Sequence, residues 1–310
     1  MLRYFLKRLM FLIPVLLGVS VVIFSIVHLA PGDPAEVMLG PSATQEEISS
    51  LREQLGLTKP LYVQYGIFLT NALKGDLGRS IKSNAPVVDE IMERFPATLT
   101  LAVLGMIFAI VIGLPLGILA ALKQNTWVDA LCSFFALVGF SIPNFWVGLM
   151  LMLLLSIYIP ILPSSGFDSW KNFIMPTIVL GIQTMAVIAR MTRSSMLEVI
   201  RQDYVRTARA KGISHNKVIR RHALKNSLLP TITVAGLQVG ALLSGAVVTE
   251  TVFSWPGIGR FLVSSISWRD TPCVLGCVVI FVLTFSIINL IVDILYGFVD
   301  PRIKAIYKKA

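Results

Sequence analysis

Charged residues are scarce in this sequence: they make up 14% of its 310 residues, while 55% are hydrophobic. An average soluble domain has about 25% charged residues, so this chain has too few to cover a water-exposed surface. Several of its apolar runs are also longer than the roughly 20 residues that a helix needs to cross a bilayer. The scarcity of charge therefore excludes an ordinary soluble protein and predicts a membrane protein with several spans.

Cysteine and histidine are equally scarce, with three of each. The cysteines, Cys132, Cys273 and Cys277, lie in or at the edge of apolar segments, and their spacing is not that of a zinc or thiol-redox site. They are expected to be buried small hydrophobic side chains. The histidines are scattered and form no H-E-x-x-H motif, so we expect no fixed metal site.

Two catalytic signatures are missing as well. The sequence has no G-x-x-x-x-G-K-[ST] motif, the loop that holds nucleotide phosphates, so ATP hydrolysis would have to take place on another subunit. No histidine lies in the middle of an apolar run, where a serine nucleophile within the membrane would need a base. The chain is therefore not expected to be an enzyme. Its net charge of +10 lies in loops beside apolar runs, where membrane topology explains it better than nucleic-acid binding.

Six apolar runs are present, at residues 9–30, 97–122, 130–159, 173–189, 228–248 and 273–299. Backbone groups in lipid must be hydrogen-bonded internally, and these runs are too long for barrel strands, so each is expected to be a helix. Pro143 interrupts the third run. The first run is longer than a signal-peptide core and no small-residue cleavage site follows it, so we interpret it as a retained span. The predicted fold is an all-α membrane protein with six transmembrane helices.

Lysine and arginine predict the orientation, because they are enriched in cytoplasmic loops. With the N-terminus in the cytoplasm, the inner pieces 1–8, 123–129, 190–227 and 300–310 hold 18 basic residues, and the outer pieces hold 9. Six of those nine lie in the long segment 31–96, to which the rule gives little weight. Both termini are therefore expected in the cytoplasm.

The outer segment 31–96 is expected to be structured. Thr44 is followed three residues later by Glu47, the pattern of a capping box, and apolar residues then recur at helical spacing. A second run, PLYVQYGIFLTNALKGDLG, repeats this spacing and ends at glycines. Two interpretations remain open: a small cap on the helical bundle, or a docking surface for an external protein.

Positive charge is densest at residues 206–230, which hold seven lysines and arginines and no acidic residue. Upstream, RMTRSSMLEVIRQDYVRTARAKG is typical of a helix that continues out of the fourth span and stops at Gly212. A short helix follows, capped by Ser214, with Val218, Ile219, His222 and Ala223 on one face, and Pro230 falls in the first turn of the next span. Either anionic lipid headgroups hold this segment, or it inserts into a groove on a cytoplasmic partner.

Several motifs resemble one family along nearly the whole chain: PGDPAEVMLG, LGLTKPLYVQYG, DYVRTARAKG, RHALKNSLLP, TETVFSWPGIGR and NLIVDILYGFVDPRI. Together they are similar to the dipeptide/oligopeptide/nickel permeases of ABC importers, and most of all to the B-type dipeptide permeases. The general importer loop begins Glu-Ala-Ala, whereas Arg206, Thr207 and Ala208 stand here, so individual contacts of sugar importers do not transfer.

The resemblance implies a permease subunit with the type I ABC importer fold that carries short peptides inward. Nickel or another chelated metal, or glutathione, is the alternative cargo, and a passive channel is a distant alternative. The implied partners are a second homologous permease, two cytoplasmic ATPases that use ATP and magnesium, an external substrate-binding protein and membrane lipid. The chain itself is expected to bind no cofactor and to lie in the bacterial inner membrane.

The apolar runs divide the chain into residues 1–30, 31–96 and 97–310, and the resemblance implies a coupling loop at 195–227 within the last part. The residues expected to couple it to the ATPases are Thr207, Ala208, Lys211, Gly212, His215, Val218, Ile219 and His222.

Polar residues within spans are costly in lipid and tend to face interiors or pathways. The substrate path is expected to include Asn144, Gln183, Gln238 and Glu250. Each has a plainer alternative: a packing kink beside Asn144, helix-to-helix hydrogen bonds for the two glutamines, and an ion pair with Arg260 for Glu250. Gating or helix packing is expected of Pro143, Gly240, Gly245, Asp293 and Arg190, the last two as an ion pair.

Overall fold

The computed structural model describes residues 2–29, 33–40 and 43–299. Within these ranges the chain is helical and has no named strand, and its helices form two compact units. The central unit comprises Leu99–Trp255 and the chain from Ile287 onward, and the N-terminal unit comprises Leu2–Thr98 and Pro256–Ser286. The functional separation of 1–30, 31–96 and 97–310 stays a prediction.

Helices of the N-terminal unit begin with α1 (Leu2–Leu29), α2 (Pro34–Leu39), α3 (Gln45–Gln54) and α4 (Leu61–Leu73). The first turns of α5 (Val87–Leu122), then α12 (Ile258–Ser267) and the first half of α13 (Thr271–Val299), complete it. The described part of segment 31–96 is therefore structured, as predicted. Its capping box is confirmed: the Thr44 side chain accepts from the Glu47 backbone N–H, and the Glu47 carboxylate accepts from the Thr44 backbone N–H. These hydrogen bonds from Thr44 lower the pKa of Glu47 below its ordinary value.

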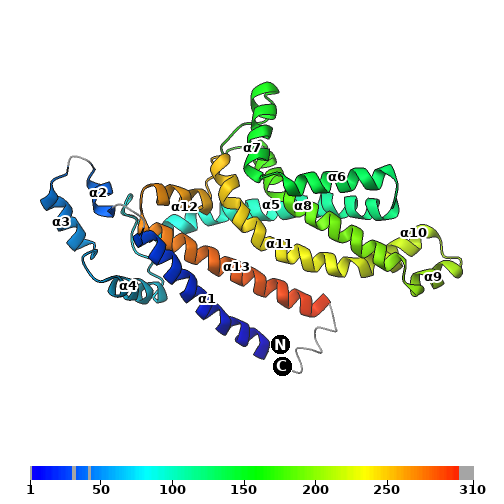
Figure 1. Cartoon of the computed structure of the whole chain (residues 1–310), viewed down its shortest axis with the longest axis horizontal. Helices are drawn as coiled ribbons and strands as arrows, with labels where there is room; N and C mark the ends of the chain where they lie inside the picture. The colour runs from blue at the N-terminus through cyan, green and yellow to red at the C-terminus, as the bar shows by residue number, and fades with distance from the viewer. Residues whose placement is uncertain (1, 30–32, 41–42, 300–310) are drawn as a thin grey trace. The chain divides into compact units, whose positions relative to one another are not determined.

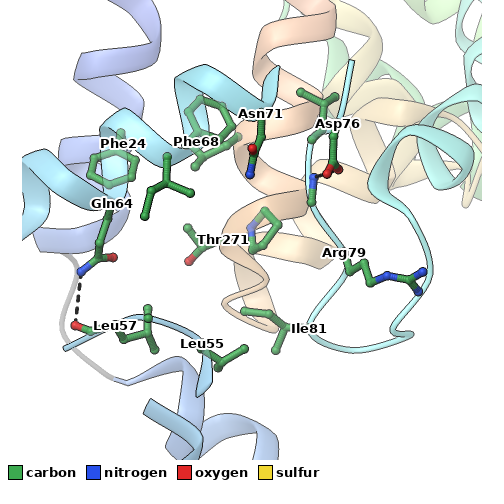
Figure 2. Close-up of a pocket in the computed structure, with 16 residues that line it drawn as sticks. Phe24, Leu55, Leu57, Gln64, Phe68, Asn71, Asp76, Arg79, Ile81 and Thr271 are labelled. Carbon is green, nitrogen blue, oxygen red and sulfur yellow. Dashed lines mark hydrogen bonds between the residues drawn. The ribbon is translucent and has the colours of Figure 1, made fainter. Parts of the chain in front are cut away.

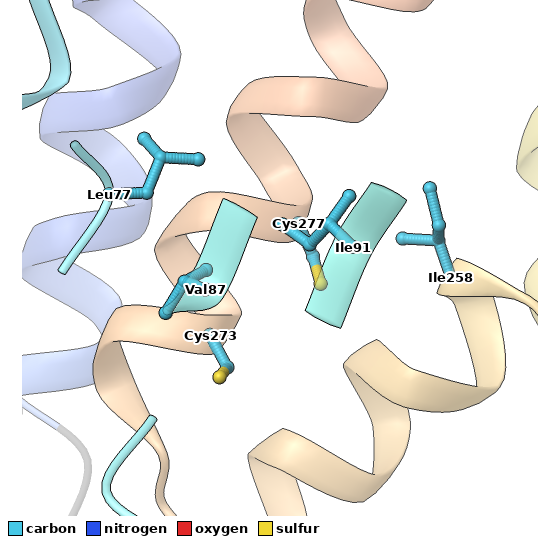
Figure 3. Close-up of a cluster of buried hydrophobic side chains, with 6 residues drawn as sticks. All are labelled: Leu77, Val87, Ile91, Ile258, Cys273 and Cys277. Atoms are coloured by element: carbon cyan, nitrogen blue, oxygen red, sulfur yellow. The ribbon is translucent and has the colours of Figure 1, made fainter. Parts of the chain in front are cut away.

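A hydrophobic cluster forms the core of the N-terminal unit. Figure 3 shows its members: Leu77, Val87, Ile91, Ile258, Cys273 and Cys277. Cys273 and Cys277 are free thiols buried among aliphatic side chains, and Cys132 is likewise free and buried in the central unit. The prediction that the cysteines are buried small hydrophobic residues is confirmed.

The loop before α5 is held by a buried polar contact. The Ser80 hydroxyl donates to the Asp270 carboxylate at 2.6 Å, and the other oxygen of Asp270 accepts from the Cys273 backbone N–H at the start of α13. Lys82 also lies over the ring of Trp268, 4.0 Å from its centroid. These contacts fix residues 80–82 against the connection between α12 and α13.

The central unit is built around α8 (Lys171–Ile200), which packs against α6 (Trp127–Ser141), α7 (Asn144–Met152) and α11 (Leu224–Val252) (Figure 1). Thr192 lies near Thr231 and Leu180 near Gly245, so α8 and α11 are antiparallel. The short elements are the π-helix η1 (Leu153–Tyr158), α9 (Asp203–Ala210), α10 (His215–Lys217) and the π-helix η2 (Val218–Ala223).

Four helices are long and apolar enough to cross a membrane: those at Val87–Leu122, Lys171–Ile200, His215–Val252 and Thr271–Val292. They correspond to the predicted second, fourth, fifth and sixth spans. The third span is a broken pair, because α6 and the helix Asn144–Tyr158 meet at 101°. The first span is helical, and the apolar part found in it is Ile13–Val27. The helical membrane fold is confirmed, while a count of six complete spans stays a prediction.

Candidate functional site

The basic segment begins with a break that the sequence did not predict. The helix expected to run from the fourth span to Gly212 ends at Ile200, and α9 starts at Asp203. The expectation of one continuous helix was wrong because Gln202 is extended (ψ 148°) and its carbonyl accepts from the N–H of Val205. The chain therefore turns a corner between α8 and α9.

Gly212 ends α9, as predicted. Its φ is +74°, a left-handed conformation that L side chains rarely adopt. The Gly212 N–H donates to the Arg209 carbonyl at 3.0 Å, and the Ile213 N–H donates to the Ala208 carbonyl at 3.4 Å. This pair of bonds is a Schellman motif, which satisfies carbonyls at the helix end and reverses the chain.

The restart after Gly212 differs from the prediction in two details. Ser214 occupies the N-cap position of α10, but its side chain makes no capping hydrogen bond. Pro230 was expected in the first turn of the next span, yet it is the seventh residue of α11. The reason is that η2 leads into α11 without a break, so the span's helix begins earlier, at Leu224.

Burial divides the eight predicted coupling residues. Ala208 and Val218 pack with Val205 in one cluster, and Ile219 packs with Met196 and Ala121 in another. By contrast, Thr207, Lys211, Gly212 and His215 are exposed, and His222 is half-buried. The buried residues thus anchor the segment to its own chain, and the exposed ones remain available for a partner.

We call residues 203–223 the platform. Its exposed basic side chains are Arg206, Arg209, Lys211, Lys217, Arg220 and Arg221. A hydrogen bond of 2.8 Å from the Asn226 amide to the Tyr204 hydroxyl ties the platform to α11. These basic side chains are thus exposed on a segment that is fixed to the helices around it. The segment connects α8 to α11 (Figure 1).

The broken helix brings two of the predicted path residues together. Pro143 is the N-cap of α7, and the Gln183 amide of α8 donates to the Ile142 carbonyl at the break, at 3.3 Å. The side-chain oxygen of Asn144 is buried and has no hydrogen-bond partner among the described residues. Gly245 lies opposite, since a Cβ there would stand 3.5 Å from the Asn144 amide nitrogen.

The other two path residues lie along α11. Gln238 is half-buried, and Glu250 is fully buried twelve residues further on, which is about 18 Å along a helix. The four polar residues therefore do not converge on one point, and their place on a substrate path stays a prediction. Gly240 is buried on the same helix.

The predicted ion pair between Arg190 and Asp293 stays a prediction, because the Asp293 side chain lies outside the described residues. The Arg190 guanidinium lies over the ring of Phe140, 4.4 Å from its centroid.

One ion pair of the central unit was missed by the sequence analysis. Arg193 of α8 donates to both carboxylate oxygens of Asp129 at the start of α6, at 2.6 and 2.7 Å. The same carboxylate accepts from the Asn125 backbone N–H and the Ser133 hydroxyl, and Asp129 is only 5% exposed. A usable signal existed: both residues fall at the predicted inner ends of neighbouring spans.

We call the contacts between α6 and α8 the polar seam: Asp129 with Arg193, Phe140 with Arg190, and the Ile142 carbonyl with Gln183. The order of the pairs makes the two helices antiparallel. Buried alanines fill the space between them, namely Ala136, Ala186 and Ala189.

A glycine seam that was not predicted from the sequence joins α5 to α8. It is formed by Gly105, Gly113 and Gly117 of α5 and Gly181 of α8. An added Cβ would lie 2.6 Å from the Met185 carbonyl oxygen at Gly113 and 2.5 Å from that of Ala189 at Gly117. Only glycine permits such close contact. The matching order of the contacts shows that α5 and α8 run parallel.

The N-terminal unit holds a pocket of about 300 Å³ between its loop helices and the start of α13. Figure 2 shows apolar side chains such as Phe68 and Leu57 around it, with Asn71 and Asp76 at its edge. The Gln64 amide donates to the Leu57 carbonyl at 3.2 Å, which helps to hold the wall in place. Across the described part of the chain, no group of three His, Cys, Asp or Glu could hold a metal ion.

Two family matches cover most of the chain. Residues 113–305 match the binding-protein-dependent transport system inner membrane component, and residues 1–102 match the N-terminal part of such membrane components. The chain belongs to this family. It is a membrane-spanning permease subunit of an ABC importer, rather than an enzyme, in a family of multi-pass inner-membrane proteins.

Curated relatives agree over nearly the full length of the permease. It is 46% identical to the dipeptide transport system permease protein DppB of Alkalihalophilus pseudofirmus, over 98% of this chain and 100% of that protein. It is 47% identical to the glutathione transport system permease protein GsiC of Salmonella typhimurium and 45% identical to that of Escherichia coli, each over 98% of this chain and 99% of the relative.

Solved structures share the permease's fold. An inward-facing MetNI methionine ABC transporter matches with a TM-score of 0.57 at 19% identity, over 68% of this chain and 96% of that chain. An amino acid ABC transporter with histidines also gives 0.57, at 14% identity, over 67% and 94% of the two chains. The expectation of an importer permease fold is confirmed.

Proposed function

We propose that the permease imports short peptides, delivered by an external substrate-binding protein. The observation that supports this cargo is the identity of 45–47% to relatives named for dipeptide and glutathione transport. Glutathione is itself a tripeptide, so both cargoes carry amide groups and free carboxylates. Glutathione is therefore the first alternative, and a chelated metal such as nickel is the second.

Uptake by cells that depend on this permease tests the cargo. Labelled dipeptide, glutathione and a chelated nickel complex are offered separately to the parent strain and to a strain that lacks the permease gene. We expect only dipeptide uptake to fall to background in the deletion strain. Loss of only glutathione or only nickel uptake would reject the peptide assignment in favour of that cargo. Flux through the purified permease without ATP would favour a passive channel.

The exposed face of the platform is the second part of the proposal: it docks on a cytoplasmic ATPase. Support comes from its geometry, because the buried cluster around Val205 and Val218 fixes the platform to the bundle while Thr207, Lys211 and His215 stay exposed. A rigidly based, projecting segment transmits motion from a partner, whereas a flexible one would absorb it. Anionic lipid headgroups are the alternative occupant of this basic surface.

This proposal includes the rest of the assembly. A second, homologous permease completes the path, and two ATPases close with bound ATP and magnesium. This chain binds neither group. The platform lies on the cytoplasmic side together with both termini, in keeping with the 18 basic residues assigned to that side. The structured segment 31–96 then faces outward, where it either caps the bundle or contacts the binding protein.

Negative charge introduced on the platform tests the docking. Lys211→Glu and His215→Glu leave the buried clusters intact, so the permease should insert normally while the ATPases no longer co-purify and uptake is lost. Lys171→Glu, an exposed lysine at the other end of α8, is the matched control and should keep the ATPases bound. Normal ATPase co-purification in both platform variants would reject docking at this surface and favour the lipid alternative.

Ile219→Asp is a weaker test, because Ile219 is buried. A charge there would disrupt the platform's own packing rather than a contact with a partner.

A further inference from the structure

Asp129 is an unusual residue for its surroundings. It lies at the first turn of an apolar helix in a membrane protein and is only 5% exposed. An ionised carboxylate in such a place is costly unless it is paired. Its two oxygens accept four hydrogen bonds, from Arg193 twice, Asn125 and Ser133. The carboxylate therefore joins α8, α6 and the turn between α5 and α6 at one point.

A buried ion pair is weak evidence for stability, since well-packed apolar residues hold helices equally well. The pair instead fixes the register of α6 along α8. Sliding α6 by one turn along α8 would move the charges about 5.4 Å apart and leave both unpaired. The bidentate geometry also fixes the angle of approach, because the guanidinium fork accepts only a narrow range of orientations. The pair therefore makes the start of α6 move together with α8.

The position of the pair connects the platform to the broken helix. Arg193 lies seven residues before the end of α8, about 10 Å from the corner that leads into the platform. A second contact, from Arg201 to the Gln124 side chain at 3.5 Å, joins that corner to the turn between α5 and α6. The other end of α6 has no ion pair among the described residues: a neutral hydrogen bond at Ile142, Arg190 on Phe140 and the packing of Gly139 against Ile182 hold it. The helix is thus held by a charge pair near the platform and by uncharged packing and weaker polar contacts at the break.

We propose that Asp129 and Arg193 are positioning residues for transport: they make α6 a lever that carries movement of the platform to the break at Pro143. This inference rests on the proposed docking of the platform. When an ATPase moves the α8–α9 corner, the ion pair moves the start of α6 with it. The 101° bend between α6 and α7 then changes, next to Gln183 and Asn144. Without the pair, the ATPases would still bind and hydrolyse ATP, but the movement would not reach the break.

The test uses the complete transporter in proteoliposomes and measures ATP hydrolysis and substrate uptake together. Arg193→Lys keeps the charge but loses the bidentate fork. It should retain both ATPases and increase the number of ATP molecules hydrolysed per substrate roughly tenfold. The neutral pair Asp129→Asn with Arg193→Gln leaves no unpaired charge, so it avoids the destabilisation expected of either single loss, and it should be uncoupled to a similar degree.

Two further variants make the test specific. The exchanged pair, Asp129→Arg with Arg193→Asp, restores the attraction and should bring the ratio back to within about threefold of the parent. Recovery is incomplete because an arginine at position 129 cannot accept from the Asn125 N–H. Arg94→Lys changes an arginine–carboxylate pair within one helix of the N-terminal unit, that with Glu90, and should leave the ratio unchanged.

An unchanged ratio in Arg193→Lys and in the neutral pair, with the ATPases bound, would overturn the proposal and leave the pair as a structural tie. Loss of the ATPases from these variants would overturn it too, because the pair would then be needed for assembly. Failure of the proposed docking of the platform is detected separately, by measuring ATPase co-purification with Lys211→Glu and His215→Glu.

Discussion

Helix α8 meets two neighbours in opposite ways. Against α5 it uses the glycine seam, where backbones approach until a Cβ would lie 2.5–2.6 Å from a carbonyl oxygen. Against α6 it uses the polar seam, where one ion pair, one hydrogen bond and one cation–π contact accompany buried alanines. Lipid supplies little hydrophobic drive for helices to associate, so both seams depend on contacts of another kind.

The difference shows how each neighbour is constrained. Close backbone packing along Gly105, Gly113 and Gly117 fixes α5 to α8 at several points, so the two parallel helices behave as one body. The polar seam concentrates its strength at Asp129 and weakens toward Ile142. Strong contacts at the start of α6 and weaker contacts at its end allow the end of the helix, next to the break at Pro143, to move.

Removal of one charge from the ion pair between Asp129 and Arg193 should have the largest effect on the free energy of unfolding. Asp129→Ala leaves the Arg193 guanidinium without its partner, and we expect the free energy of unfolding in detergent to fall by about 3 kcal/mol. This is the lower end of the usual range, because the Arg193 side chain is 32% exposed. A titration with denaturing detergent measures it. The double variant Asp129→Ala with Arg193→Met should recover most of the loss, and equal losses in the two variants would contradict this account.

The second-largest loss in the free energy of unfolding should come from a single methyl group added in the glycine seam. Gly117→Ala places a Cβ against the Ala189 carbonyl, a backbone atom that cannot move aside, and we expect a loss of about 2 kcal/mol. The matched control is Gly66→Ala in α4, where a Cβ meets nothing within 4 Å. There the change should stabilise the helix by up to about 1 kcal/mol. The same titration compares the two, and equal effects at both positions would show that α5 and α8 are not in close contact.

Loss of the hydrogen bond at the break should cost less. Gln183→Leu removes the donor to the Ile142 carbonyl, and we expect a loss of about 1 kcal/mol, typical of a hydrogen bond between membrane helices. Because this contact lies at the weak end of the polar seam, its stability effect should be smaller than that of Asp129→Ala. A loss as large as that of Asp129→Ala would mean that the seam is equally strong at both ends.

The smallest effect is expected at Arg190. Arg190→Met keeps the length of the side chain but removes its charge from the Phe140 ring, and we expect a loss of about 0.5 kcal/mol. Thermal stability of the purified permease measures it. A loss above about 2 kcal/mol would indicate a stronger partner for Arg190, for which Asp293 is the predicted candidate.

Much of the fold follows from the sequence because each span is dictated by its own composition. Apolar length predicts where helices lie, and the Gly212 stop and the Thr44 capping box are local signals that the structure confirms. What the sequence did not predict depends on partners far apart in the chain. Asp129 is part of a short polar loop in sequence, and only the neighbouring α8 makes it a buried ligand of Arg193.

Separation in the sequence also explains which glycines were predicted to pack between helices and which were not. Gly240 and Gly245 were noticed because they are close together in sequence, whereas the closest backbone contacts are spread along α5 and α8 at Gly105, Gly113, Gly117 and Gly181. Likewise, the helical spacing of Val218 and Ile219 does not show in which direction this apolar stripe faces. Only packing against Val205 and Met196 shows that it points into the permease's own core rather than toward a partner.

The π-helix η2 at Val218–Ala223 sets the rotation of everything that follows it. Each residue of an α-helix turns the chain by about 100°, and a π turn contains one residue more than an α turn. If the same six residues wound as an ordinary α-helix, all of α11 would be rotated by about 100° relative to the platform. Thr231 and Gly245 would then no longer face α8. The length of this one turn thus determines which face of α11 packs against α8.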